Sequence, residues 1–402
     1  MDFSLPPALD DIRLRTRAFV ADHILPLEQD PGARDEHENI AEPALARVRA
    51  LAKAQGLWSP QVPVALGGMG LPMVGQAAMY EEANRSIFGP VCFNCAAPDD
   101  GNMRLLATVG TEVQKARWLA PIVSGEVRSA FAMTEPAPGG GSDPAMIGTK
   151  AERIAGGWRI SGRKWYITGA GVAAHVILMA RTSDDPRKGL TAFLFHKDQP
   201  GWEIVRRIPI MGPEEHGGHC ELAFDGLEVS DADVLMGVGD GLKVTQIRLG
   251  AARLTHCMRW LGLSKRCLEI AQEYVSQREG FGIRLADRES VQIKLGQAAS
   301  AIEIGRLLTM KAAWALDKGS HAKTEVSMAK VQVADTLHLC ADTAIQLCGA
   351  KGYSKDTVLE WIYRYARQAR LVDGASEVHA MVLANAYGRH GDCFWSWGRT
   401  DG

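Results

Sequence analysis

The stretch Phe131-Ala-Met-Thr-Glu-Pro136, which runs on through glycines to Ser142-Asp143, is the most informative part of the sequence. It begins as a short apolar run typical of a strand. Pro136 and the glycines then favour a loop, because proline cannot donate to a strand ladder and glycine accepts unusual turn geometries. A strand that ends at Thr134 and opens into glycines can bring backbone N–H groups and a hydroxyl close to a planar polar ligand. These residues alone leave a cofactor site and an ordinary strand-loop equally open.

Two further segments lie near the other end of the chain. They read Gln346-Leu-Cys-Gly-Ala-Lys-Gly-Tyr353 and Arg370-Leu-Val-Asp-Gly-Ala-Ser-Glu-Val-His379. Together with the stretch around Thr134, they resemble the signature regions of the acyl-CoA dehydrogenase superfamily, whose members are flavoenzymes. The resemblance covers nearly the whole chain, because Gly162-Arg-Lys-Trp-Tyr-Ile-Thr168 and Arg278-Glu-Gly-Phe-Gly282 are similar to two more of its motifs. The last segment is most similar to the branch whose signature reads Asp-Gly-Pro-Asp-Glu-Val-His.

Composition limits the classes of function. The chain has 402 residues, 46% of them hydrophobic, which is enough for two or three packed units with sizeable cores. A formal net charge of −2 predicts no basic surface for nucleic acid. The N-terminus lacks the basic and apolar regions of a secretory signal, and no apolar run reaches the length of a membrane span. Eight cysteines scattered through expected core helices favour a reducing, cytoplasmic location.

Three regions of the chain differ in pattern. Residues 1–125 are expected to form an N-terminal helical domain, with helices such as 9–27 and 42–55. Residues 126–235 are expected to form a middle β domain, in which Gly156-Gly157 joins two extended runs as a hairpin turn would. Residues 236–402 are expected to form a C-terminal helical bundle.

The bundle is predicted from apolar spacing. Apolar residues recur every seven positions from Ile247 to Val275, and similar stripes run through residues 291–305 and 333–347. Three long helices with one apolar stripe each predict an antiparallel bundle. The predicted fold class is therefore mainly α with a central β domain. This is the layout of acyl-CoA dehydrogenases: helical N-terminal domain, small β-barrel or sheet domain, and C-terminal four-helix bundle.

The resemblance assigns a catalytic base. In the superfamily, a carboxylate removes the α-proton of an acyl thioester while the β-hydrogen leaves as hydride to flavin N5. Many members use the Glu of an Ile-Tyr-Glu-Gly-Thr stretch, and the matching stretch here is Leu371-Val-Asp-Gly-Ala375, so the base falls on Asp373. Other members place a Glu just before the arginine that matches Arg253, where this chain has Ala252.

Asp373 differs from that Glu by one methylene, so the substrate must ride closer or its α-carbon must be activated differently. Burial against the flavin is expected to raise the pKa of Asp373 toward neutral pH. The alternative interpretation is that Asp373 caps a helix beginning near Gly374, and the two roles can coexist.

The resemblance also implies an FAD site. Five residues of the middle region are carried over as flavin-ring contacts: Phe131, Met133, Thr134, Tyr166 and Thr168. Arg278 would contact the FAD pyrophosphate with Phe281 nearby, while Gln346, Gly349 and Gly352 would close the dinucleotide site from a neighbouring subunit. Such sharing requires at least a homodimer, and relatives are commonly tetramers. Two departures from the family pattern, Ala375 for Thr and Tyr365 for Asp, leave the affinity for FAD open.

The second ligand implied is the acyl-CoA. Ser142 resembles a residue on the CoA side, and Arg253 resembles one near the CoA phosphates, with an ordinary helix salt bridge as its alternative role. The backbone N–H of Asp373 would bind the thioester oxygen beside Gly374. Val372 replaces a Tyr of many members and leaves more room there.

Three other patterns resemble sites but are interpreted otherwise, and no metal is expected. Cys92-x-x-Cys95 has no second pair to complete a structural zinc site. His216-Gly-Gly-His219-Cys220 is expected to be a loop near the ligand entrance. Gly237-x-Gly239-x-Gly241 lacks a surrounding βαβ unit, so a strand-to-helix hinge is expected.

The sequence therefore predicts an FAD-dependent acyl-CoA dehydrogenase of fatty acid metabolism that forms an α,β double bond and passes electrons to an electron-transfer flavoprotein. One alternative is a flavin oxidase of the same fold that acts on a non-CoA compound such as a nitroalkane. Another is a flavin-carrying protein without catalysis. The polar residues Glu81, Asn94, Asp99 and Asp100, in a region expected to form the pocket floor, favour a short or polar-substituted acyl chain.

Overall fold

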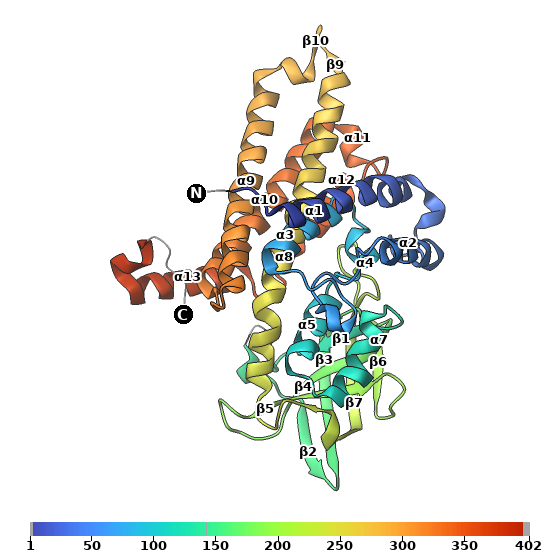
Figure 1. The fold of residues 1–402 in the computed structure, drawn as a ribbon, viewed down its shortest axis with the longest axis vertical. Coiled ribbons are helices and arrows are strands. Elements are labelled where there is room, and N and C mark those ends of the chain that lie inside the picture. The colour runs from blue at the N-terminus through green and yellow to red at the C-terminus, as the bar shows by residue number, and fades with distance from the viewer. Residues whose placement is uncertain (1–2, 142, 397–402) are drawn as a thin grey trace.

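The computed structural model describes residues 3–141 and 143–396. The long-helix bundle and the first helices of the chain lie at one end of the molecule, and the sheet, with later helices of the first region beside it, lies at the other end (Figure 1). The expected class, helical N- and C-terminal parts around a central sheet, is confirmed. In the part of the chain that is described, no helix is long and apolar enough to cross a membrane.

The N-terminal region is built from short helices. The helix expected over residues 9–27 is present as α1, a π-helical turn at Val20–Ile24 and a 3₁₀ turn at Leu25–Gln29. The helix expected over residues 42–55 is α2. The helices are α1 (Pro7–Phe19), α2 (Glu42–Ala54), α3 (Met73–Ala83), α4 (Gly89–Cys92), α5 (Asp99–Val109), α6 (Glu112–Gln114) and α7 (Ala120–Val123).

The middle region forms an eight-stranded sheet in the order β6-β7-β3-β2-β4-β5-β8, with β1 parallel to β4. The predicted hairpin joins β2 to β3, and Gly156 in its turn has a φ of 75°. The strands are β1 (Arg128–Ala132), β2 (Lys150–Ile154), β3 (Gly157–Thr168), β4 (Ala173–Arg181), β5 (Leu190–His196), β6 (Trp202–Arg207), β7 (His219–Ser230) and β8 (Val234–Leu235).

Both faces of the middle of this sheet are buried. In β4, Val176 and Leu178 pack into a core made by the sheet itself. Ile177 and Met179 point to the other side, into a core shared with α5 and the residues around α7. The alternation in β4 therefore separates two cores rather than a core from solvent, and the sheet end becomes fixed against the helices.

The C-terminal region is organised around α8, which has 37 residues and is about 55 Å long. The three apolar stripes predicted from the sequence lie on α8, α9 and α10, as expected. The helices are α8 (Gly241–Gln277), α9 (Glu289–Asp317), α10 (Lys323–Cys348), α11 (Ala350–Tyr353), α12 (Leu359–Gln368) and α13 (Ser376–His390). The short strands β9 (Glu279–Gly280) and β10 (Ile283–Arg284) form a hairpin at the tip between α8 and α9 (Figure 1).

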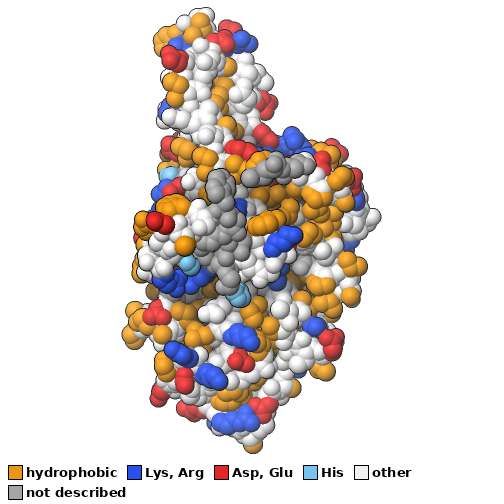
Figure 2. All heavy atoms as spheres, turned by 60° about the vertical axis from the view of Figure 1, so that its left-hand side comes forward, with side chains coloured by type: hydrophobic (Ala, Val, Ile, Leu, Met, Phe, Trp, Pro, Cys, Tyr) orange, Lys and Arg blue, Asp and Glu red, His pale blue; other side chains and the backbone are white. Residues whose placement is uncertain are grey.

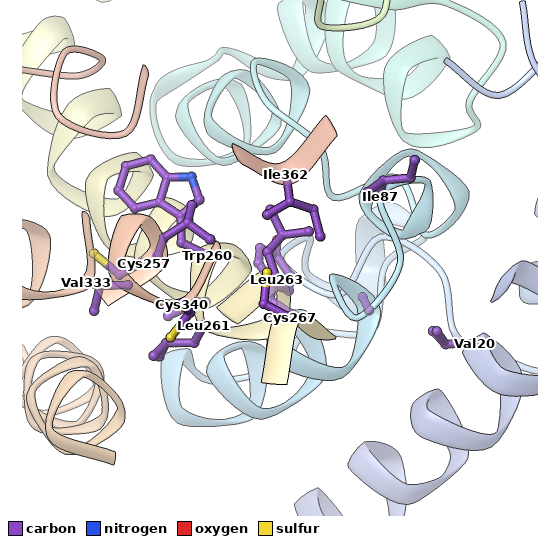
Figure 3. Close-up of a cluster of buried hydrophobic side chains, with 14 of the residues drawn as sticks. Val20, Ile87, Cys257, Trp260, Leu261, Leu263, Cys267, Val333, Cys340 and Ile362 are labelled. Atoms are coloured by element: carbon purple, nitrogen blue, oxygen red, sulfur yellow. The ribbon is translucent and has the colours of Figure 1, made fainter. Parts of the chain in front are cut away.

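Helix α8 is surrounded by other elements at its centre, where all residues from Leu254 to Ser264 are buried. Figure 3 shows the reason: Cys257 and Leu261 of α8 lie beside Val333 and Cys340 of α10, and Ile362 of α12 lies near Leu263. A helix held in this way is a rigid support for polar side chains that project from it toward the sheet.

Candidate active site

A pocket lies where the three regions meet. Residues 97–100 at the start of α5 form one wall, and Thr168 at the end of β3 forms another. Ala252 and His256 line it from one face of α8, and Asp373 lines it from the turn between α12 and α13. The fold thus brings Asp373 and Thr168, two residues singled out in the sequence, to the same pocket.

The turn that carries Asp373 has left-handed backbone geometry. The φ angles are 52° at Asp373 and 96° at Gly374. Asp tolerates this region better than most residues, and glycine adopts it without steric cost because it has no Cβ. A Cβ at Gly374 would also lie only 3.2 Å from His379 Nε2. The turn therefore presents a carboxylate on a backbone shape that few other sequences adopt.

Three basic side chains fix this turn through its carbonyl groups. Arg253 Nε donates to the carbonyl of Asp373 at 2.9 Å, and His379 Nε2 lies 3.4 Å from the same oxygen. Lys330, fully buried on α10, donates to the carbonyl of Ala369 at 2.8 Å and lies 3.4 Å from that of Gly374. The position of the carboxylate is thus determined by helices α8, α10 and α13.

The helix-cap interpretation of Asp373 is wrong. Helix α13 begins at Ser376, its N-cap residue is Ala375, and no side chain caps it. The Asp373 side chain, which is 19% exposed, contacts His256 instead, with Oδ2 lying 3.2 Å from His256 Nε2. The carboxylate is thus directed at the pocket wall of α8.

His256 is the second member of a chain of polar contacts. Arg259 Nη2 lies 3.2 Å from His256 Nδ1, and Arg259 Nη1 donates to Asp100 Oδ2 at 2.6 Å. Thr255 also donates to Asp100 Oδ2, at 2.7 Å. Because a guanidinium can only donate, His256 Nδ1 must accept, which leaves its ring proton on Nε2 to donate to Asp373. The network therefore assigns the tautomer of His256.

The pKa of Asp373 is shifted in the direction opposite to the expected one. Burial raises it, but the hydrogen bond from His256 and the positive charges of Arg248 and Arg253 outweigh burial and hold this pKa well below its usual range. The expectation of a raised pKa is therefore wrong for the chain itself. Sequence reasoning missed the effect because it counted the desolvation of Asp373 and not its basic neighbours.

Tyr166 and Thr168, two of the residues assigned to the flavin ring, lie at the C-terminal end of strand β3. Thr168 Oγ1 lies 3.1 Å from His219 Nδ1, and both residues line the pocket. Tyr166 is 49% exposed at a φ of 52°, with its ring edge-on to Trp165. A hydroxyl inside the pocket and an exposed aromatic ring beside it can hold a planar polar ligand.

The other three residues assigned to the flavin ring lie at or beyond the end of β1. Met133 is buried, whereas Phe131 and Thr134 are half-buried. The Thr134 hydroxyl donates to the carbonyl of Trp165 at 2.7 Å, so in this geometry it can offer a ligand only acceptor lone pairs. Arg248 covers the Phe131 ring, with its guanidinium carbon 4.3 Å from the ring centre.

The residues assigned to the rest of the dinucleotide are far from Asp373 in this chain. Arg278 directly follows the last residue of α8. It lies 22 residues beyond His256, which corresponds to a helix rise of about 33 Å. Arg278, Gln346 and Gly349 are exposed, and Phe281 is 101% exposed. Gly352 is buried against Ile345 and Cys348, where a Cβ would meet atoms at 2.9 Å. One chain does not bring these residues to the pocket.

The residues assigned to the acyl-CoA have mixed outcomes. Ser142 lies outside the described residues. Arg253 makes no ion pair with a carboxylate within the described ranges; it donates a hydrogen bond to the Asp373 carbonyl instead, so the salt-bridge interpretation is not supported. The Asp373 N–H has no hydrogen-bond acceptor among the residues described, which leaves it available beside Gly374 for a ligand.

Sequence reasoning missed Arg248 and gave His256 no role. Both lie on α8 at spacings of four residues with Ala252, so one helix face carries Arg248, Ala252 and His256 into the pocket. The detectable signal was the spacing of Arg248 and His256, which lie four residues before and four residues after Ala252. That signal needs the knowledge of which α8 face meets the sheet.

The patterns that resemble other sites have ordinary positions. Cys92 and Cys95 are buried with free thiols, and no group of three potential metal ligands occurs in the described part of the chain. The loop that carries His216 and His219 lies at the pocket, with His216 Nδ1 3.1 Å from Arg128 Nη1. Gly241 is the first residue of α8, which follows β8, so the glycines form the expected strand-to-helix hinge.

Comparisons with known proteins are consistent along the whole chain. Models of the acyl-CoA dehydrogenase N-terminal, middle and C-terminal domains match residues 6–126, 130–227 and 239–388. Probable acyl-CoA dehydrogenase FadE2 of Mycobacterium tuberculosis is 35% identical over 397 residues, which covers 96% of this chain and 97% of that protein. Acyl-CoA dehydrogenase family member 11 of Gallus gallus is 35% identical over 389 residues, 93% of this chain. The chain spans about half the length of that relative, 50%.

Solved structures agree with these matches. A candidate acyl-CoA dehydrogenase from Mycobacterium abscessus superposes with a TM-score of 0.90 at 33% identity, covering 96% of this chain and 99% of the other. A glutaryl-coenzyme A dehydrogenase in complex with glutaryl-CoA gives a TM-score of 0.84 at 28% identity, covering 96% and 97%. The fold and the sequence therefore lead to the same group of proteins.

Proposed function

The chain belongs to the acyl-CoA dehydrogenase family of FAD-dependent oxidoreductases, and from that premise we propose that it oxidises an acyl-CoA to the 2-enoyl-CoA with Asp373 as the base. One observation carries the proposal. An ionised carboxylate on a fixed turn faces a pocket that also holds Thr168, and one oxygen of that carboxylate is left without a partner among the described residues. A fixed carboxylate in a pocket is what proton abstraction next to a thioester requires.

The residues present fit FAD. Thr168 supplies a hydroxyl inside the pocket, and Tyr166, two residues earlier on β3, supplies an exposed ring. Arg278 is an exposed guanidinium suited to a pyrophosphate. When bound, FAD supplies the two-electron acceptor for the β-hydrogen. Arg278, Gln346 and Gly349 would serve the FAD of a neighbouring copy.

The two carboxylate oxygens of Asp373 have different tasks in this proposal. Oδ2 accepts the hydrogen bond from His256, so Oδ1 takes the α-proton. The free backbone N–H of Asp373 would donate to the thioester oxygen, where negative charge develops as the α-proton leaves. Arg253 holds the carbonyl of the same residue, which keeps base and donor in one fixed geometry.

The lowered pKa of Asp373 has a cost and a benefit. The carboxylate is ionised over the whole physiological pH range, so the base is always in the required state. A carboxylate with so low a pKa is also a weak base, because affinity for a proton is what the pKa measures. The α-proton must therefore be acidified by the donor to the thioester oxygen.

Assembly and partners complete the proposal. Large hydrophobic side chains of α9, including Ile293, Leu307 and Trp314, are exposed in the single chain, which supports a homodimer or homotetramer. Figure 2 shows Lys and Arg side chains mixed with Asp and Glu over one face, rather than a basic surface for nucleic acid. We assign an electron-transfer flavoprotein as the acceptor and, from the eight free cysteines, the cytoplasm as the compartment.

The test is anaerobic flavin reduction by acyl-CoA thioesters. The purified flavoprotein is titrated with short, long, branched and hydroxylated acyl-CoAs while the flavin absorbance is followed. One class should bleach the flavin, and Asp373→Asn should slow that reduction roughly a thousandfold, within the usual range for a lost general base. The matched control is Asp373→Glu, which retains a carboxylate and should retain measurable reduction.

Other outcomes identify the alternatives. Rapid oxygen consumption with a non-CoA acid such as a nitroalkane, and none with thioesters, would replace the dehydrogenase with an oxidase. A flavin that no thioester or nitroalkane reduces would favour a non-catalytic flavoprotein. Reduction that Asp373→Asn leaves unchanged would remove Asp373 as the base.

A further inference from the structure

Arg248 is a buried cation in the wall of the pocket. Its side chain, on α8, is 7% exposed, and it lines the pocket together with Ala252 and His256. Residues four apart on a helix share a face, so Arg248 lies one turn before Ala252 and two turns before His256. The guanidinium is therefore further along the pocket from His256, the residue that contacts the Asp373 carboxylate.

The guanidinium is only partly satisfied. Arg248 Nε donates to Asn102 Oδ1 at 3.0 Å, and its other contact is the face of the Phe131 ring at 4.3 Å. An arginine carries five N–H donors, and only one of them has an acceptor among the described residues. Within the same ranges, no carboxylate lies at ion-pair distance from Arg248.

Three other buried cations in this part of the molecule have a carboxylate in contact, whereas the buried Lys330 donates to backbone carbonyls. Arg259 contacts Asp100, Arg128 contacts Asp99, and Lys164 contacts Glu135. Burying a charge without such a counter-charge is costly. Among the described residues, Arg248 contacts neither a carboxylate nor a backbone carbonyl, and it faces the pocket.

The nearby carboxylates do not supply the missing partner. Asp373 and Asp100 both exert an attractive charge on Arg248, but neither contacts it. Asp373 Oδ2 contacts His256, and Asp100 Oδ2 accepts from Arg259 and Thr255. A ligand that enters the pocket is the remaining source of an acceptor.

We propose that Arg248 binds an oxyanion carried on the acyl chain of the substrate, a carboxylate or a phosphate ester, on the far side of the carbons being oxidised. The proposal rests on the function proposed above. Ala252, between Arg248 and His256, has a small side chain that leaves space for the acyl chain to pass. A guanidinium is matched to carboxylate and phosphate because it forms two parallel charge-assisted hydrogen bonds with either.

The competing interpretation is that Arg248 acts only on Asp373. Its charge helps to hold the pKa of that carboxyl low, so its removal would affect the base whatever the acyl chain carries. The two interpretations differ in one readout. A role in substrate recognition changes the preference between charged and uncharged acyl chains, whereas a role in tuning the base changes both substrates alike.

The experiment compares acyl-CoAs of equal chain length. The first arm uses adipyl-CoA against hexanoyl-CoA, and the second uses a hydroxyhexanoyl-CoA phosphate ester against the unphosphorylated compound. We expect the wild-type enzyme to favour at least one anionic substrate by tenfold or more in kcat/KM. Whichever arm shows the preference identifies the oxyanion.

Variants of Arg248 test the assignment. Arg248→Met should lower the preference at least tenfold, mainly through a higher KM for the anionic substrate. Arg248→Lys, which keeps the charge but not the fork, should keep part of it and remains informative if the Met variant fails to fold. Arg159→Met, an exposed arginine of β3 paired with Glu228, is the matched control and should behave as wild type.

Three results would overturn the proposal. A wild-type preference for uncharged chains in both arms would contradict it directly. An equal loss on charged and uncharged substrates in Arg248→Met would assign Arg248 to the base instead. If no thioester at all reduces the flavin, the proposed function fails first, whereas reduction by hexanoyl-CoA without a charge preference leaves that function standing and removes only this inference.

Discussion

The first half of α8 and the segment just beyond its end differ in how far their functional side chains are exposed. Near its start, Arg248 and His256 are buried and lie close to a turn that three basic side chains hold in place. Just beyond its end, Arg278 and Phe281 are exposed. The sequence assigned Asp373, beside the first pair, and Arg278 and Phe281 to ligand binding. The contrast indicates that one chain completes the pocket around Asp373 but contributes the other end of the helix to a site elsewhere.

The local energetics of the two ends differ accordingly. The carboxylate of Asp373 is linked through His256 and Arg259 to Asp100, so each member is held by its neighbours. Phe281 has a φ of 52°, which is strained for a bulky residue, and no apolar packing among the described residues offsets that strain. Strain without a partner in the same chain is explained when the partner is a second copy or a ligand.

The largest test of this contrast is Arg278→Glu. If Arg278 contacts the FAD pyrophosphate, reversing its charge removes a charge-assisted hydrogen bond and adds repulsion, so the Kd for FAD should rise at least a hundredfold. The melting temperature of the apo-protein should stay within about 2 °C, because the side chain is exposed. Isothermal titration of apo-protein with FAD measures the first quantity, and calorimetry measures the second.

The matched control is Arg159→Glu, which changes an exposed arginine of the sheet by the same amount of charge. Its affinity for FAD should remain that of the wild-type protein. An unchanged Kd in Arg278→Glu would remove the far end of α8 from the cofactor site and so break the comparison.

The buried end is tested by His256→Leu. This change removes the donor to Asp373 Oδ2, so the pKa of Asp373 should rise. A hydrogen bond to a charged group contributes about 1.5–3 kcal/mol, which corresponds to roughly one to two pH units. The acid limb of the pH profile of flavin reduction should therefore move to higher pH by that amount. His256→Gln, which keeps an N–H donor, should shift it less.

The free energy of unfolding should depend on pH through the same shift in the pKa of Asp373. A carboxylate whose folded pKa is depressed contributes stability above its unfolded pKa of about 3.9, and that contribution is lost as the pH falls through the folded value. The wild-type protein should thus exceed His256→Leu in stability at pH 7, with the difference narrowing below about pH 4. A difference that widens in acid would contradict the assigned direction of the shift.

These comparisons also indicate what the sequence could reveal. The three long helices followed from apolar spacing because a helix face repeats locally. Asp373 followed from resemblance to a signature. The lowered pKa of Asp373 did not, because it depends on His256, Arg248 and Arg253, which lie more than a hundred residues away in the chain. The helix-cap interpretation failed for a related reason: only the structure shows that α13 begins at Ser376, after the left-handed turn.

The smallest expected effect is that of Phe281→Ala on the folding of the chain itself. The side chain is fully exposed, and its ring faces Arg288, whose guanidinium carbon lies 5.8 Å from the ring centre. Truncation should change the free energy of unfolding of the apo-protein by less than about 0.5 kcal/mol, measured by urea denaturation. Retention of FAD and the assembled fraction in sedimentation velocity should both decrease a few-fold, because the ring would be buried only against a second copy or its ligand.

The matched control is Val113→Ala, which truncates another exposed apolar side chain far from that hairpin and should leave both quantities unchanged. A loss of more than about 1 kcal/mol in apo-protein stability would mean that Phe281 serves its own chain, and both ends of α8 would then be complete within one subunit.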